Sequence, residues 1–193
     1  MASKQTGTSA KKQTAIIISG FACIGKSKFS GLKTYQGYEI VDLDSAGYTV
    51  DPKTKVKRDS KTFVEAYIKD ILAYAYRPAN KKVILMMSTH LEIRQEMCKR
   101  GLKYTLVYPQ PGAECKGAWL TRLRERAGED ALYKFFADKW AFLIDGLENG
   151  FTTFESKAGA TRVRLGKDDY LTANKQRPGA IVEIHRVARQ SLQ

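Results

Sequence analysis

The most constraining feature of the sequence is a glycine-rich segment that directly follows a short apolar run. Residues 14–19 are rich in β-branched side chains, which is typical of a strand buried on both faces of a parallel sheet. The next residues match the pattern G-x-x-x-x-G-K-[ST] at every defined position, and read Gly20, Phe21, Ala22, Cys23, Ile24, Gly25, Lys26 and Ser27. A helix-compatible stretch, residues 26–33, comes next. Strand, loop and helix in this order predict a phosphate-binding P-loop.

The chemistry of such a loop assigns a role to each of its residues. Glycines allow successive backbone N–H groups to turn toward an anion at a helix N-terminus. Lys26 is expected to reach the β- and γ-phosphates of ATP, and the Ser27 hydroxyl is expected to bind Mg²⁺. We assign no chemistry to the thiol of Cys23. The residues expected to hold ATP are Gly20, Ala22, Cys23, Ile24, Gly25, Lys26, Ser27 and Lys28.

Apolar runs alternate with amphipathic stretches along the rest of the chain. Strands are predicted over 14–19, 38–41, 82–87, 104–108 and 161–165, and helices over 26–33, 62–76, 91–100, 114–127 and 129–147. Residues 180–184 are apolar but do not discriminate between strand and helix. The alternation predicts an α/β fold, with helices on both faces of a parallel sheet and ligands at the carboxyl ends of the strands.

Two carboxylates follow the second predicted strand, at the same sheet edge as the P-loop. We expect Asp44 to act as a general base or to orient the acceptor together with Ser45, and Asp42 to lie near the metal. The alternative is a turn with a helix cap, since Asp and Ser both favour such positions.

The third strand ends without an acidic residue, and a histidine and an arginine follow it. His90 is a candidate donor to a substrate, with helix capping as the alternative. Arg94 comes one helical turn later on the same face, where it is a candidate for bidentate phosphate binding. A solvated helix face is the competing interpretation for Arg94.

The densest cationic run lies in the helix predicted over 114–127. Arg122 and Arg126 share one face of that helix. A Pro-Gly loop precedes it and provides a hinge, so we expect a lid over about 109–130 whose arginines neutralise charge on the γ-phosphate. An exposed helix laced with glutamates is the alternative.

Composition limits the possible partners. The formal net charge is +13, which predicts attraction to nucleotides or to a nucleic acid strand. Tyr35, Tyr38 and Tyr48 are candidates for stacking a base, although core packing also explains them. The three cysteines are too scattered for disulfides or a zinc site. No apolar stretch is long enough to span a membrane, and we expect a cytoplasmic protein, in the host cytoplasm if it is viral.

With these motifs in place, the chain resembles the P-loop nucleoside and nucleotide kinases, in particular the small kinase-like proteins of bacteriophage genomes. The resemblance rests on the P-loop, on residues 41–45, 88–94 and 106–109, and on the arginine-rich helix that runs to Gly128. It implies a three-layer fold like that of the P-loop NTP hydrolases, with a central sheet of strand order 2-3-1-4-5, ATP at the P-loop, and an arginine-bearing lid. The kinase domain would span 14–170, between a flexible basic arm, 1–13, and a basic extension, 171–193.

The acceptor is left open by this resemblance. The chain lacks the signature that adenylate kinases carry after the third strand, while the aspartate after the second strand also resembles that of polynucleotide kinases. We therefore consider a kinase that acts on a free nucleotide or nucleoside, a kinase that acts on a hydroxyl within DNA or RNA, such as a hydroxymethylated base in phage DNA, and a non-catalytic nucleotide-binding module.

Overall fold

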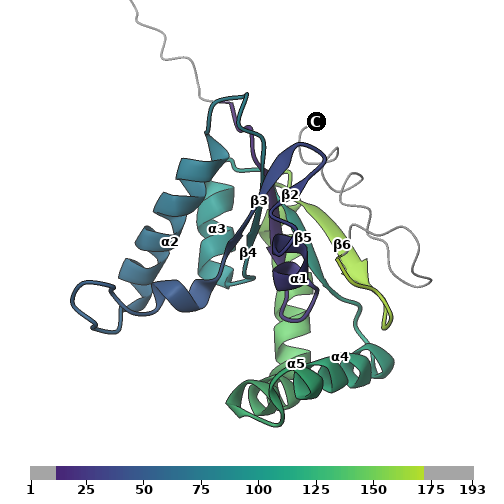
Figure 1. Ribbon diagram of the computed structural model, residues 1–193. Helices are drawn as coiled ribbons and strands as arrows, with labels where there is room; N and C mark the ends of the chain where they lie inside the picture. Colours follow the sequence, from purple (N-terminus) through teal and green to yellow (C-terminus); the bar gives the residue numbers. More distant parts are fainter. Residues whose placement is uncertain (1–11, 172–193) are drawn as a thin grey trace, which may run out of the picture.

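The computed structural model describes residues 12–171, which form a six-stranded sheet with helices packed against it (Figure 1). The strands are β1 (Ile16–Gly20), β2 (Thr34–Tyr35), β3 (Tyr38–Leu43), β4 (Val83–Met87), β5 (Thr105–Pro109) and β6 (Thr161–Leu165). The helices are α1 (Lys26–Ser30), the 3₁₀ helix η1 (Ser45–Tyr48), α2 (Ser60–Ala75), α3 (Leu91–Lys99), α4 (Ala113–Ala127), α5 (Ala131–Gly150) and the π-helix η2 (Phe151–Glu155).

The strand order is β2-β3-β4-β1-β5-β6, which differs from the expected five-stranded order 2-3-1-4-5. The difference is β2, a two-residue strand that pairs antiparallel with β3 at the edge of the sheet. The other neighbouring strands pair in parallel. The strands β1, β4 and β5 are buried at every position, which explains their almost uninterrupted apolar sequences.

Helices lie on both faces of the sheet. Figure 1 shows α2 and α3 together on one side and the short helix α1 on the other. The first helix is shorter than the 26–33 expected from the sequence. It ends at Ser30 because Gly31 caps it, and because Lys33 then adopts a left-handed backbone conformation with φ of 58° that leads into β2.

Side chains bind the carboxyl ends of three strands to one another. The hydroxyl of Tyr67, on α2, donates to the carbonyl of Leu43 at 2.5 Å and accepts from the backbone N–H of Ser88 at 3.2 Å. The Ser19 hydroxyl donates to the carbonyl of Ser88 at 3.1 Å. These bonds join the ends of β3, β4 and β1, so the edge that carries the P-loop is rigidly built.

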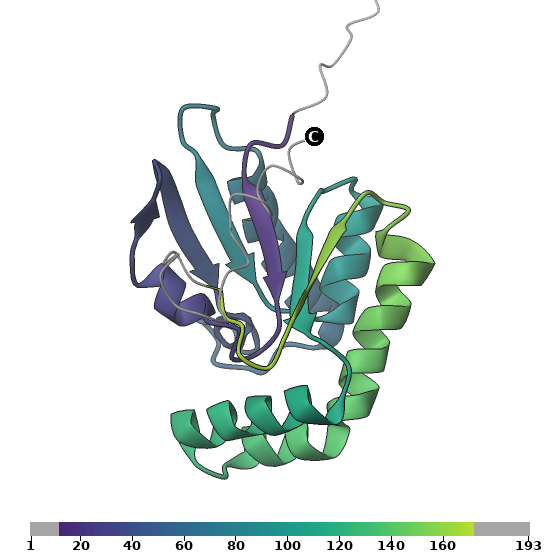
Figure 2. The same cartoon turned by 90° about the vertical axis from the view of Figure 1, so that its right-hand side faces the viewer.

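The helices α4 and α5 form a hairpin below this edge (Figure 2). The hairpin is anchored to the P-loop by aromatic packing, since the ring of Phe21 lies 5.1 Å from that of Phe136 and 5.9 Å from that of Trp140. Both contacts are edge-on, the favoured geometry for aromatic pairs. These contacts fix the position of α5 relative to the P-loop.

Within residues 12–171, no helix has the length and apolar character needed to cross a bilayer. Most of the basic arm predicted over 1–13 and most of the C-terminal extension, with the apolar stretch 180–184, lie outside the described residues.

Candidate nucleotide-binding site

The P-loop has a backbone at Gly25 that favours glycine. Gly25 caps α1 with φ of 103°, and a Cβ there would lie 2.8 Å from the carbonyl oxygen of Leu171. A Cβ on Gly20 would lie 2.4 Å from Cδ1 of Ile24, so a larger residue there would require the Ile24 side chain to move. The loop leads straight into the N-terminus of a helix, the arrangement that binds phosphate through backbone N–H groups.

Lys26 projects back over the loop. Its Nζ donates to the carbonyls of Gly20, at 2.6 Å, and Phe21, at 2.9 Å. Burial lowers the pKa of Lys26 to about 8, and the negative charge of Asp42 is the strongest influence opposing this decrease. The ammonium is therefore held beside the loop by weak carbonyl partners that a phosphate can replace.

Asp42 is the carboxylate most strongly coupled to this lysine. It lies in β3 opposite Met86 of β4, and its Oδ1 atom is buried with no hydrogen-bond partner among the described residues. Burial raises the pKa of Asp42, and the charge of Lys26 partly offsets the increase. Buried polar atoms are almost always paired, so an unpaired carboxylate oxygen beside a P-loop lysine marks a position for a ligand.

Asp44 is placed differently from Asp42. It is exposed and caps η1, where its Oδ1 accepts from the backbone N–H of Ala46 at 3.1 Å. Ser45 begins that 3₁₀ helix. The turn-and-cap alternative therefore describes the local contacts of Asp44, although its charge still acts on Lys26.

His90 lies at the N-terminus of α3 but its side chain makes no capping hydrogen bond. Its ring meets that of Phe63, on α2, edge-on at 5.2 Å. Desolvation lowers the pKa of His90, so the ring is neutral at pH 7. A neutral imidazole beside an aromatic ring is better suited to contacting a planar group than to neutralising a phosphate.

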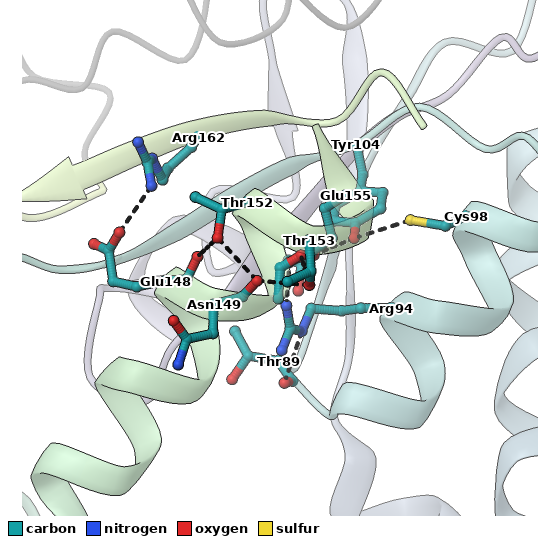
Figure 3. A network of polar contacts seen from close by, with 12 residues as sticks. Thr89, Arg94, Cys98, Tyr104, Glu148, Asn149, Thr152, Thr153, Glu155 and Arg162 are labelled. Carbon is teal, nitrogen blue, oxygen red and sulfur yellow. Dashed lines mark hydrogen bonds and ion pairs between the residues drawn. The ribbon is translucent and has the colours of Figure 1, made fainter. Parts of the chain in front are cut away.

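Arg94 is not available to a substrate, which corrects the sequence-based expectation. It is 2% exposed and forms an ion pair with Glu155 of η2, which is 0% exposed (Figure 3). Its Nε also donates to the carbonyl of Thr89 at 3.2 Å, and the hydroxyl of Tyr104 donates to the same Glu155. Arg94 therefore belongs to a buried polar network that joins α3 to η2.

Arg122 is likewise engaged inside the protein. Its guanidinium lies between two aromatic rings, 4.0 Å from the ring centroid of Trp119 and 3.9 Å from that of Tyr170. It also donates to the carbonyls of Asp169, at 3.2 Å, and Lys167. With both faces covered, Arg122 joins α4 to the segment after β6 and is not directed at a phosphate.

Arg126 is the arginine of α4 that remains available. It is exposed, forms no ion pair with any carboxylate of residues 12–171, and its charge lowers the pKa of both Lys26 and Asp42. Of the two arginines expected in the lid, Arg126 is thus the one whose charge acts on Lys26 and Asp42, whereas Arg122 anchors α4 to the segment after β6.

Two further residues support the loop and were not identified from the sequence. The indole N–H of Trp119 donates to the carbonyl of Ala22 at 3.0 Å. The backbone N–H of Leu171 donates to the carbonyl of Ile24 at 2.7 Å. The spacing of Trp119 and Arg122, one helical turn apart, could have indicated a role for Trp119, since an arginine and an aromatic residue at that spacing can stack.

The donor set near the loop suits a cation that arrives with its phosphates. Among the residues described, no group of three or more histidine, cysteine or carboxylate side chains is arranged to hold a metal ion. Mg²⁺ commonly takes one or two protein oxygens and completes its coordination with phosphates and water. Ser27, which is exposed at the start of α1, can supply one such oxygen.

Comparisons with known proteins find similarity among solved structures alone. No protein-family model matches the chain, and no curated protein matches its sequence. Among solved structures, the tunicamycin resistance protein of Deinococcus radiodurans is similar, with a TM-score of 0.46 and 16% identity over 79% of this chain and 86% of that chain. At this level the similarity says nothing about substrate.

Proposed function

We propose that the protein is an ATP-dependent phosphotransferase that moves the γ-phosphate to a nucleotide or nucleoside acceptor, either free or within DNA or RNA. The observation that carries the proposal is the unpaired, buried Oδ1 of Asp42 beside Lys26. A carboxylate oxygen without a partner is available to take the proton of an acceptor hydroxyl, which is the role that phosphate transfer to a hydroxyl gives to such a group.

The proposed step uses Asp42 as a general base when the acceptor is a hydroxyl. The carboxylate takes the hydroxyl proton while the acceptor oxygen forms a bond to the γ-phosphorus. The bond between that phosphorus and the bridging oxygen of ADP breaks, and ADP leaves with the electron pair. The raised pKa of Asp42 favours this role, because a more basic carboxylate accepts a proton more readily.

Cations would neutralise the charge that moves during the step. The Lys26 ammonium would exchange its carbonyl partners for the β- and γ-phosphate oxygens. Arg126 would approach the γ-phosphate from α4. The Ser27 hydroxyl would help to hold the Mg²⁺ that arrives with ATP, and this ion would offset charge on the phosphate oxygens.

The acceptor would lie between the β3 edge and α2. Asp44 and Ser45 lie at the start of η1, and His90 with Phe63 provides a neutral ring pair nearby. Planar ring surfaces and a carboxylate together are suited to a nucleoside, whose base stacks and whose hydroxyl reacts.

The experiment is phosphate transfer from γ-labelled ATP to mononucleotides, nucleosides, oligonucleotides and hydroxymethylated DNA, offered in parallel. The proposal predicts label on at least one acceptor, and loss of that label in K26A. If the protein binds ATP but labels no acceptor, and D42N leaves its biological activity intact, the non-catalytic alternative would replace the proposal.

A further inference from the structure

A strongly basic loop joins the two helices, η1 and α2, that flank the proposed acceptor site. It spans residues 51–58, between η1 and α2, and Val50 and Lys57 form an antiparallel bridge across it. Figure 1 shows this segment at the lower end of the view, the same end as the α4–α5 hairpin. Three of its lysines are exposed, namely Lys53, Lys55 and Lys57.

The carboxylates of this region do not neutralise those lysines. Asp51 accepts from the backbone N–H groups of Lys53, at 2.9 Å, and Thr54, at 3.0 Å, and pairs with Arg58 at 3.2 Å. The backbone bonds are the main reason that the pKa of Asp51 decreases to about 2. Asp59 caps α2 by accepting from Thr62 N–H at 2.7 Å. Both acidic residues are thus used to shape the loop.

The cationic charge that remains is therefore uncompensated. Within the described part of the chain, Lys53, Lys55 and Lys57 form no ion pair. The backbone hydrogen bonds of Asp51 and the bridge at Lys57 give the loop a defined shape, so the lysines are displayed on a structured surface.

Aromatic side chains connect this loop to the carboxylate edge. The loop leads into the first turn of α2, which carries Phe63. The ring of Phe63 lies 5.8 Å from that of Tyr67 and 5.2 Å from that of His90. Tyr67 is buried and its hydroxyl donates to the carbonyl of Leu43, between Asp42 and Asp44 in the sequence, so it joins the ring of Phe63 to the carboxylate edge. Lysines, the rings of Phe63 and His90, and a carboxylate thus follow one another along the chain segments that flank the acceptor site.

From this succession we infer that the acceptor is a nucleic acid strand, whose phosphate backbone lies on the 51–58 loop while one of its hydroxyls faces Asp42. The inference rests on the proposed function and names its substrate class. A free nucleotide ends at its own phosphates, within the acceptor site. A strand continues beyond the site, and only a continuing polyanion meets three lysines on an outward-facing loop. The net charge of +13 favours the same partner.

The test compares two charge-reversed variants of the full chain. K53E/K55E/K57E changes the loop, and K69E/K81E/K82E is the matched control, because those three lysines are exposed on α2 and before the amino end of β4. Both variants lose the same charge. Binding of single-stranded DNA and RNA oligonucleotides is measured over a range of salt concentrations, with ATP affinity and label transfer measured on the same samples.

We expect the loop variant to bind oligonucleotides at least tenfold more weakly than the control, with the slope of log K against log salt reduced by about 2, or about 0.7 for each lost phosphate contact. Transfer to oligonucleotides decreases in parallel, while ATP affinity does not change. DNA and RNA serve as separate arms, and preference for either supports the inference.

Two results would overturn the inference while leaving the proposed function in place. One is efficient transfer to free nucleotides with no transfer to oligonucleotides. The other is equal oligonucleotide binding by the loop variant and the control. Failure of the wild-type protein to bind ATP would instead remove the proposed function.

Discussion

Burial lowers the pKa of Lys26 to about 8, and Asp42, whose Oδ1 has no hydrogen-bond partner among residues 12–171, is the charge that opposes this decrease most strongly. Neither residue has a charged partner in a hydrogen bond or ion pair among residues 12–171. The lysine donates to two backbone carbonyls, and the carboxylate oxygen is unpaired. A bound triphosphate would provide oxygens for the lysine, and an acceptor hydroxyl would donate to the carboxylate.

ATP affinity should decrease as the pH rises through about 8. Only the protonated form of Lys26 binds phosphate strongly, and bound phosphate raises its pKa, so binding takes up a proton above the pKa of the free protein. Affinity should then fall by up to about tenfold per pH unit above 8. Titration of ATP binding between pH 7 and 10 measures this. K26R is the control, since arginine stays charged over that range. A wild-type affinity that does not change up to pH 9.5 would contradict the prediction.

Gly25→Ala should disable the phosphate-binding loop. An alanine at φ of 103° is strained, and its Cβ would lie 2.8 Å from the carbonyl oxygen of Leu171. We expect ATP affinity to fall at least about tenfold, the equivalent of about 1.4 kcal/mol, since a left-handed residue other than glycine costs about 1–2 kcal/mol. Gly117→Ala is the control, because Gly117 lies inside α4 with open space around it and should be neutral or slightly stabilising. Equal ATP binding by both variants would argue against the role of Gly25.

Substitution of Arg94 should affect the stability of the fold, whereas substitution of Arg126 should affect phosphate transfer. Arg94→Met leaves Glu155 buried without its cation, which should lower the free energy of unfolding by about 3–5 kcal/mol. ATP affinity, measured under conditions in which the variant is folded, should stay unchanged.

Arg126→Met should change the free energy of unfolding by less than about 0.5 kcal/mol, because the side chain is exposed, yet it should slow phosphate transfer. Denaturant unfolding and single-turnover transfer measure the two effects. If R94M were as stable as the wild type but bound substrate more weakly, Arg94 would have a role in substrate binding instead.

The sequence predicts the P-loop and the parallel strands well, because their signals are local. A strand buried on both faces must be apolar throughout, and a loop that binds phosphate must carry its glycines and lysine at fixed spacing. The edge strand β2 was missed because two residues carry no periodicity. It changes the strand order without altering the edge where ligands would bind.

The contacts of Arg94 and Arg122 could not be predicted, because their partners lie far along the chain. The carboxylate that binds Arg94 is 61 residues away, and the carbonyls that bind Arg122 are 45 and 47 residues away. Helical spacing shows which residues share a face but not what that face meets. For the same reason the sequence favoured Asp44 as the base, whereas the structure leaves Asp42 as the carboxylate without a partner.

The rate of phosphate transfer in D42N at pH 7, under single-turnover conditions with saturating ATP, decides whether Asp42 is the general base. Asparagine preserves the shape of Asp42 but is not a base. D44N is the matched control, because asparagine also caps a helix well. We expect D42N to slow transfer by at least about 100-fold, the usual contribution of a general base, while D44N stays within a few-fold of the wild type. Transfer by D42N at the wild-type rate would show that Asp42 is not the base.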